Sequence, residues 1–392
     1  MRGKLKKLFA AVLAVLLALS FSGCSELTGL DAQALMSPPK TTADREAIYA
    51  LMGGGVGDVT LVYPKCGDYR SAIISRDLDG CGTSEVVSFC ANGDAGGTRL
   101  EFFKKNTDGV WNSMARFTSA ATQVDKVFFG DLTGDGMDEI IVGWGDPLTA
   151  TASVSVYYVD GDTIREFSMT TVSYSEILLT DFDSDNIKEL FVLQAAQTSG
   201  EEIMALGGDQ PYVSKTVPLD AAVTRYTSVS FSQVNSWRRA AVLDGVKADG
   251  RMLTQVIGYD EASDRLISPL SNEENATDRP TAAAAVSRDV NKDGILEIPT
   301  AELTINGSET TADSTGSVIT WNTYSLQDNT LTPVCTSILN TAENYNLFLP
   351  SSEDNYGCQN DTVTRTATFF TYTQIGFNGN YLGREDKFSI RV

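Results

Sequence analysis

An acidic nine-residue segment occurs four times in this chain of 392 residues, and each copy runs into an apolar stretch. Every copy begins with Asp and ends with Glu, with oxygen-bearing side chains at the third position and, in three copies, at the fifth. Oxygen ligands at alternate positions of a short loop suit a hard cation such as Ca²⁺. A motif that recurs at long intervals predicts a repeat architecture. The copies are residues 77–85, 131–139, 181–189 and 289–297.

The spacing of the copies indicates the size of the repeat. Their first residues, at positions 77, 131, 181 and 289, are separated by 54, 50 and 108 residues. Because 108 is twice 54, we expect one more copy near the middle of the last interval, where residues 229–243 end in an apolar run but lack the acids. A unit of slightly more than about fifty residues, holding about four short strands, fits one blade of a β-propeller.

The local patterns favour β-structure and exclude EF-hands. Asp108–Gly109 and Asp160–Gly161 are hairpin signals between strand-like runs, and we also expect strands at 58–63 and 71–74. An EF-hand needs a bidentate Glu at position twelve and a helix after the loop. Position twelve is never acidic here, and β-rich runs such as 140–142 follow the loops.

These features resemble the FG-GAP or VCBS repeats of integrin-α-like β-propellers, in which Asp-x-Asp/Asn-x-Asp-Gly-x-x-Glu enters a strand. The resemblance implies an all-β fold: a propeller of six or seven blades of about 50 residues each, with a short N-terminal helix and a small β-rich C-terminal segment. It also implies structural Ca²⁺ between two strands of a blade. The implied ligands are Asp131, Thr133, Asp135, Glu139 and the Met137 carbonyl; Asp289, Asn291, Asp293, Glu297 and the Ile295 carbonyl; Asp181, Asp183, Asp185 and Glu189; and, as a weaker set, Asp77, Asp79 and Glu85.

Two copies depart from the motif. Asn186 stands where the motif has Gly, and Asn tolerates the left-handed backbone that such a turn requires. Cys81 replaces the third carboxylate of the first copy, and a thiol is a poor calcium ligand. The alternative to metal binding is that Asp and Gly simply build solvated turns, which we favour for 77–85 and weigh evenly for 181–189.

The N-terminus carries an export signal. Basic residues at 2–7 precede an apolar run, 8–19, that is too short to span a bilayer. Residues 21–24 resemble a bacterial lipobox, which implies cleavage before Cys24 and lipid attachment to it. We therefore expect an extracytoplasmic protein anchored by lipid to the bacterial cell membrane. An ordinary secretory peptide, cut near Ser22 or Gly23, is the alternative.

The expected organisation has four parts. Residues 1–23 form the lipoprotein signal peptide, and 24–41, with two prolines, form a tether. Residues 42–340 hold a short helix at 42–52 and then the propeller. Residues 341–392 lack the acidic motif and are expected to form a last blade or a small appended β-rich domain.

Composition narrows the function. The net charge of -21 disfavours nucleic acid as a partner. The absence of His removes Ser-His-Asp, Cys-His and His-ligated zinc chemistry. Besides Cys24 there are five cysteines, an odd number, so they cannot all pair with one another; one or two disulfides remain open.

Three functions remain open. We favour a cell-surface binding or scaffold propeller for an extracellular protein or glycan. An extracellular hydrolase or lyase that uses carboxylates is the alternative, and a purely structural envelope component is the third. Four tryptophans could stack on sugars, although packing between blades is the expected role of Trp111, Trp144, Trp237 and Trp321.

Overall fold

The computed structural model describes residues 42–55, 57–146, 151–167, 172–194, 201–207, 210–270, 276–280, 285–301, 316–340, 344–349, 355–361, 363–375 and 381–391. The predicted signal peptide, Cys24 and the tether lie outside the described residues. The chain divides into two compact units, 1–58 and 59–392, which are described separately below.

The first unit contributes one described helix, α3 (Ala43–Leu51), as the sequence predicted. Thr42 caps it, since its Oγ1 accepts a hydrogen bond from the Arg45 N–H at 3.4 Å. Asp44 and Glu46 lie in the first turn, where they suit the positive end of the helix dipole. Gly53 follows with φ of +97°, a conformation that a helix cannot continue through.

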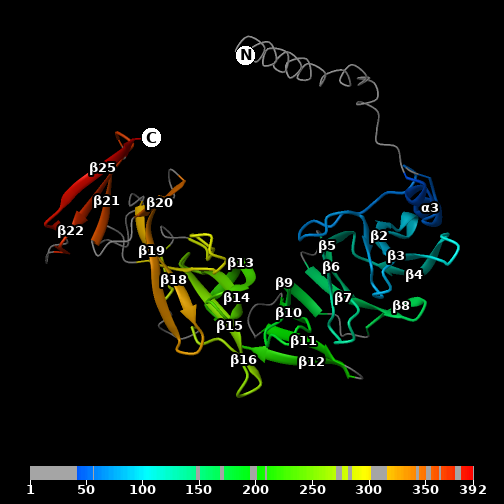
Figure 1. Cartoon of the computed structure of the whole chain (residues 1–392). Coiled ribbons are helices and arrows are strands. Elements are labelled where there is room, and N and C mark those ends of the chain that lie inside the picture. The colour runs from blue at the N-terminus through cyan, green and yellow to red at the C-terminus, as the bar shows by residue number, and fades with distance from the viewer. Residues whose placement is uncertain are drawn as a thin grey trace, which may run out of the picture. The chain divides into compact units, whose positions relative to one another are not determined.

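The second unit is built from successive antiparallel meanders (Figure 1). We call the five meanders blades 1 to 5. Blade 1 holds β1 (Ile73–Arg76), β2 (Glu85–Ala91), β3 (Thr98–Lys105) and β4 (Trp111–Ser119); blade 2 holds β5 (Gln123–Gly130), β6 (Glu139–Asp146), β7 (Thr151–Asp160) and β8 (Thr163–Glu166); blade 3 holds β9 (Val172–Thr180), β10 (Glu189–Gln194), β11 (Glu201–Gly207) and β12 (Gln210–Val217). Blade 4 holds β13 (Val223–Gln233), β14 (Arg239–Lys247), β15 (Met252–Asp260) and β16 (Arg265–Ile267); blade 5 holds β17 (Ile298–Ala301), β18 (Gly316–Ser325), β19 (Thr330–Asn340) and β20 (Tyr345–Leu349).

Neighbouring blades share their cores, because alternate residues of one strand point to opposite faces of its sheet. In β10, Leu190 and Val192 pack with blade 2, while Phe191 and Leu193 pack with blade 4. The same alternation holds in β14, where the odd-numbered core residues face blade 3 and the even-numbered ones face blade 5. The central strands are therefore buried on both faces and read as continuous apolar runs.

The predicted all-β propeller class is thus confirmed at the level of the blade: four-stranded antiparallel sheets of about fifty residues that stack in chain order. The expected acid-free copy is also present, since residues 234–238 join β13 to β14. The sheets of blades 2 and 3 are joined to each other, because β7 of blade 2 also pairs with β9 of blade 3.

The strand predicted at 58–63 is wrong. Only Leu61 forms an isolated bridge, with Cys90, at the end of β2 beyond Ile73, the first residue of β1. After Pro64 the chain leaves this edge, and the N–H groups of Lys65 and Cys66 donate to the Asp125 carbonyl in blade 2. Alternating apolar residues were therefore not enough to form a strand without a longer edge to pair with.

The C-terminal residues form smaller sheets. β21 (Asn355–Asp361), β22 (Thr366–Tyr372) and β25 (Glu385–Arg391) make a three-stranded sheet, and β23 (Gln374–Ile375) pairs with β24 (Tyr381–Leu382). The predicted C-terminal segment, 341–392, includes β20, which pairs with β19 of blade 5. Ile338 and Leu349 share a core with Phe369 and Phe370 of β22.

Two observations on the described residues concern disulfide formation and membrane-spanning helices. No disulfide joins the five cysteines of the described part. Within the same residues, no helix has the length and apolar character needed to cross a bilayer.

Candidate cation-binding loops and a neighbouring pocket

Each acidic segment is a loop that leads into a strand: the second strand of blades 1, 2 and 3, and β17, the first strand of blade 5, after the isolated bridge Arg288–Glu297. The final Glu is anchored in the same way in all four. That Glu is buried, and its Oε2 accepts a hydrogen bond from the N–H of the second loop residue. The four distances are 2.9 Å for Glu85 to Leu78, 2.7 Å for Glu139 to Leu132, 2.9 Å for Glu189 to Phe182 and 2.8 Å for Glu297 to Val290. Strands, not helices, follow the loops, which confirms the exclusion of EF-hands.

The loop backbone is also the same in all four copies, since its fourth and sixth residues are left-handed. The φ angles are +68° and +84° at Gly80 and Gly82, +79° and +84° at Gly134 and Gly136, +64° and +74° at Ser184 and Asn186, and +66° and +87° at Lys292 and Gly294. Asn186 adopts the left-handed conformation, as the sequence predicted. The turn therefore survives the loss of Gly at this position.

The first Asp of the loop holds this backbone in place. Asp131 accepts from the N–H groups of Gly134 at 2.6 Å and Gly136 at 2.8 Å. Asp289 accepts from those of Lys292 at 2.6 Å and Gly294 at 2.9 Å. These bonds fix the direction of the carboxylate before any cation binds, which lowers the cost of ordering a site.

Several buried oxygens in the loops are left without a hydrogen-bond partner. They are Asp77 Oδ1, Glu85 Oε1, Thr133 Oγ1, Asp181 Oδ1 and Glu297 Oε1. A buried polar atom without a partner costs about 1–3 kcal/mol, so each such atom in a native protein calls for a physical reason. A hard cation ligated by these oxygens removes the cost, and the residues present therefore fit Ca²⁺.

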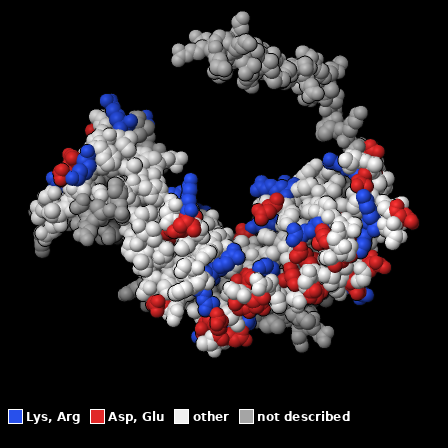
Figure 2. Space-filling model, in the orientation of Figure 1, with Lys and Arg blue, Asp and Glu red and all other residues white. Residues whose placement is uncertain are grey.

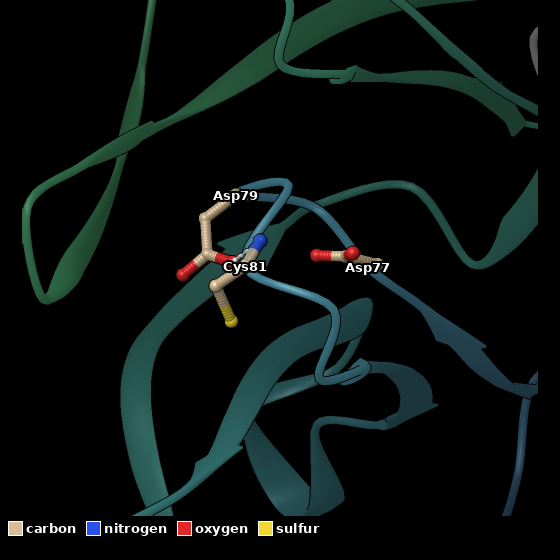
Figure 3. Close-up of side chains that lie close together, drawn as sticks. All are labelled: Asp77, Asp79 and Cys81. Atoms are coloured by element: carbon tan, nitrogen blue, oxygen red, sulfur yellow. Dashed lines mark hydrogen bonds between the residues drawn. The ribbon is translucent and has the colours of Figure 1, made fainter.

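The potential ligand side chains lie close together in some of the four loops and further apart in others. Ligand atoms of Asp181, Asp183, Asp185 and Glu189 lie within 4.8 Å of one another, as do those of Asp289, Asp293 and Glu297. Loop 77–85 brings together Asp77, Asp79 and Cys81 (Figure 3). Among the described residues, the acids of loop 131–139 do not form such a set, although Thr133 supplies a buried oxygen there.

Lysine side chains already occupy part of two loops, and the sequence reasoning missed them. Lys104, on β3, places Nζ 2.5 Å from Asp79 Oδ2 and 3.8 Å from Glu85 Oε1. Lys188 lies 3.1 Å from Asp181 Oδ2. For the other two loops, the described residues include no lysine paired with a loop acid. Lys104 is 27 residues from Asp77, so only β3–β2 pairing brings it to the loop.

The pKa shifts distinguish Asp79 from the final Glu residues, whose pKa is raised in all four loops whether or not a lysine is near. Partial burial opposes ionisation of Asp79, but hydrogen bonds from Cys81 and Lys104 outweigh it and lower its pKa to about 2. Burial, reinforced by neighbouring acids, raises the pKa of Glu139 to about 7 and that of Glu189 to about 7. Burial also raises the pKa of Glu297. Without an added cation, these buried Glu residues resist ionisation.

Two other polar clusters lie away from the loops, and both are internally paired. Asp244 is buried and accepts from Arg279 at 2.9 Å, Thr254 at 2.6 Å and Ser287 at 2.7 Å. Asp125 accepts from Cys66 Sγ at 3.3 Å and Tyr174 at 2.7 Å. Burial raises the pKa of the Cys66 thiol, which disfavours the nucleophilic thiolate.

A pocket of about 340 Å³ lies beside the 234–238 turn of blade 4. Its lining includes Trp237 and Arg239 with Tyr259 of β15, Phe182 of loop 181–189 and Gln327 of the β18–β19 turn. Trp237 is 77% exposed, whereas Trp144 and Trp321 are 3% and 1% exposed. The packing role expected for the tryptophans therefore holds for Trp144 and Trp321 and is wrong for Trp237.

Comparisons with models of protein families and with curated protein sequences gave no match. Among solved structures, the chain is similar to a protein from Lactobacillus plantarum at 9% identity, over 77% of this chain and 95% of that chain, with a TM-score of 0.29. It is also similar to the Dos1 propeller at 10% identity, over 78% of this chain and 65% of that chain, with a TM-score of 0.31. Structural neighbours thus include a propeller, but scores this low add no argument about function, and the blade architecture rests on the sheets themselves.

Proposed function

We propose that this protein is a cell-surface lipoprotein whose calcium-stabilised β-propeller acts as a binding or scaffold module for an extracellular protein or glycan. The observation that carries the proposal is the set of four loops with one backbone geometry and buried oxygens that lack hydrogen-bond partners. Such loops stabilise a scaffold. Binding then takes place on the surfaces that the scaffold presents.

Calcium is the cation that best suits these loops. Carboxylate, hydroxyl and backbone oxygens are its usual ligands, and extracellular calcium modules bind at roughly 0.1–1 mM. Loop 289–297 is the strongest candidate, because Asp289, Asp293 and Glu297 converge and Glu297 Oε1 has no hydrogen-bond partner. Loops 131–139 and 181–189 follow. Loop 77–85 is the weakest, because Lys104 already supplies a positive charge.

The polar clusters away from the loops favour a binding function over a catalytic one, because their carboxylates are already hydrogen-bonded within the protein. The carboxylates of Asp244 and Asp125 are both fully engaged in internal hydrogen bonds. A hydrolase or lyase would need acids that converge on an open site. Asp260 and Glu261 do line the open pocket at the 234–238 turn, but a hydrogen bond from Ser263 lowers the pKa of Asp260, whereas a general acid needs a raised pKa.

The calcium part is tested by thermal unfolding of the full-length protein, purified in detergent so that any lipid anchor is kept. We expect calcium to raise Tm in the millimolar range and magnesium at the same concentration to raise it much less, because Mg²⁺ demands tighter octahedral geometry. Equal Tm values in calcium and in chelator would overturn calcium stabilisation.

The anchor is tested separately. The wild-type chain should fractionate with membranes and take up radiolabelled fatty acid in a bacterial host, and Cys24→Ala should abolish the label. A labelled Cys24→Ala chain, or an unlabelled wild type that is exported and cleaved, would show that residues 1–23 are an ordinary secretory peptide.

A further inference from the structure

We infer that the pocket at the 234–238 turn binds a neutral pyranose unit of a glycan, with Trp237 as the stacking platform. The inference rests on the proposed binding function and names its ligand class and site. In blades 1 to 3 the connection before the second strand is an acidic loop, and an acidic loop also precedes β17 of blade 5, whereas here the connection carries Trp237 and Arg238 and is followed by Arg239. Blade 4 has thus replaced cation ligands with side chains suited to another kind of ligand.

Trp237 lies exposed on a turn whose backbone is held by hydrogen bonds. Asn235 Oδ1 accepts from the N–H groups of Trp237 at 3.2 Å and Arg238 at 2.9 Å, and Asn235 Nδ2 donates to the Tyr324 carbonyl of blade 5 at 3.1 Å. These bonds fix the backbone from which the indole projects. An exposed Trp on a fixed turn beside a pocket is typical of a binding site, because the ring offers a large apolar face at little entropic cost.

The rest of the lining supplies polar groups without net charge. Arg238 pairs with Glu261 at 2.9 Å, and Arg239 lies with its guanidinium 4.7 Å from the Phe231 ring centroid. Two guanidinium groups and the carboxylates of Asp260 and Glu261 cancel in formal charge. Sugar hydroxyls both donate and accept hydrogen bonds, so they match a rim that offers both kinds of partner.

Size and charge argue against other ligands. The volume of about 340 Å³ lies at the low end of the range for ligand pockets, ~300–1,000 Å³. A stable protein interface buries roughly 800 Å² on each partner, far more than this pocket offers. A polyanion is disfavoured by the net charge of -21, and on the face drawn in Figure 2 acidic and basic side chains are interspersed. A short stretch of neutral sugar fits best.

The position of the pocket also connects it to the loops. Phe182, the second residue of loop 181–189, lines the pocket and packs on Phe231 of β13 with ring centroids 4.9 Å apart. The Phe182 N–H donates to Glu189 at 2.9 Å. One wall of the pocket is therefore part of a candidate cation loop, and its rigidity depends on that loop.

The test is titration of the full-length protein with malto-, cello-, laminari-, xylo- and chito-hexaose, followed by tryptophan fluorescence and calorimetry. A polyoxyethylene detergent is needed, since a maltoside headgroup would compete. We expect at least one hexasaccharide to bind and to shift the emission of the exposed Trp237. Trp237→Ala should weaken binding roughly tenfold or more.

Trp111→Ala is the matched control, because Trp111 lies on β4 of blade 1 and outside the pocket. It should bind as the wild type does. Arg239→Gln should also weaken binding, and an unchanged Tm for each variant shows that the fold is intact. Equal binding by Trp237→Ala and wild type overturns the site.

The outcomes separate this inference from the proposed function. If no hexasaccharide binds while calcium raises Tm, the glycan inference is overturned and the calcium-stabilised module stands. If a hexasaccharide binds through Trp237 and calcium has no effect on Tm, the pocket is supported and the calcium part of the proposed function fails.

Discussion

Loops 77–85 and 289–297 have the same backbone conformation, but among the described residues a lysine lies against the acids of the first loop only. In both, the final Glu is buried and accepts from the second residue, at 2.9 Å for Glu85 and 2.8 Å for Glu297. Lys104 lies against the acids of the first loop, and no lysine among the described residues pairs with those of the second. Loop geometry thus comes from the local sequence, whereas a neighbouring strand decides whether a lysine lies against the loop acids.

Electrostatics explains why the difference matters. Acids crowded in a loop repel one another unless a positive charge is close. In blade 1, Lys104 provides it, and hydrogen bonds from Cys81 and Lys104 lower the pKa of Asp79 to about 2. The final Glu still resists ionisation in every loop, since burial raises the pKa of Glu139 to about 7 and also raises that of Glu85 beside Lys104. We propose that a bound calcium ion supplies in other blades the positive charge that the Lys104 ammonium supplies in blade 1.

If Lys104 substitutes for an ion in loop 77–85, changing one acid in each loop should affect the calcium response of loop 289–297 alone. Asp293→Asn should remove about 1.4–2.7 kcal/mol of calcium stabilisation at about 10 mM calcium, for a site with a Kd of roughly 0.1–1 mM. Asp79→Asn should leave the response to calcium unchanged. Chemical unfolding with and without calcium measures both. An equal loss in both variants would mean that Lys104 does not substitute for the ion.

Glu139→Gln tests whether burial of an acid is costly when calcium is absent. The folded pKa of Glu139, about 7, lies above its usual 4.5, so the folded state binds more protons between these values. Stability from this group is therefore complete below about pH 4.5 and is lost as pH rises through about 7.

In chelator at pH 8, Glu139→Gln should be more stable than the wild type by on the order of 1–3 kcal/mol. With calcium the order should reverse, because the amide loses the charge that the ion requires. Denaturant unfolding at pH 5 and pH 8 measures the effect. If the variant is less stable at pH 8 in chelator, Glu139 ionises without penalty.

Lys104→Met removes the built-in cation of blade 1. The loss leaves Asp79 and the buried Glu85 without their positive neighbour, and we expect a destabilisation of about 1–3 kcal/mol. Calcium should then stabilise this variant more than the wild type, because the loop acquires the need for an ion. Lys105→Met, at the next position on β3, is the control and should show no such gain.

The smallest expected effect concerns the backbone of loop 181–189. Asn186 has φ of +74° where the other loops have Gly, so Asn186→Gly should stabilise the protein by about 0.5 kcal/mol. Differential scanning calorimetry at fixed calcium measures it. Gly294→Asn, the reverse change in loop 289–297, should destabilise by a similar amount. A loss of stability in Asn186→Gly would show that the Asn side chain contributes more than its backbone.

Much of the fold could be predicted because its signals are local. The repeated Asp and Gly residues gave the loops and their spacing gave the blades, including the acid-free copy at 234–238. The strand predicted at 58–63 failed because pairing depends on a partner edge, which the local pattern does not describe. Candidate ligand residues could be named from the motif, but the lysines that lie against two of the loops could not.

The loop acids and the left-handed sixth position follow from the sequence, since they depend on residues within nine positions of one another, and the spacing of the copies gave the repeat. Only the tertiary structure decided that Lys104 reaches Asp79 and that Trp237 is exposed beside Phe182 and Gln327. The physical reason is that charge neutralisation and pocket formation depend on side chains from different strands and blades. Their distance in sequence is large, and their distance in space is set by strand pairing and by the stacking of one blade on the next.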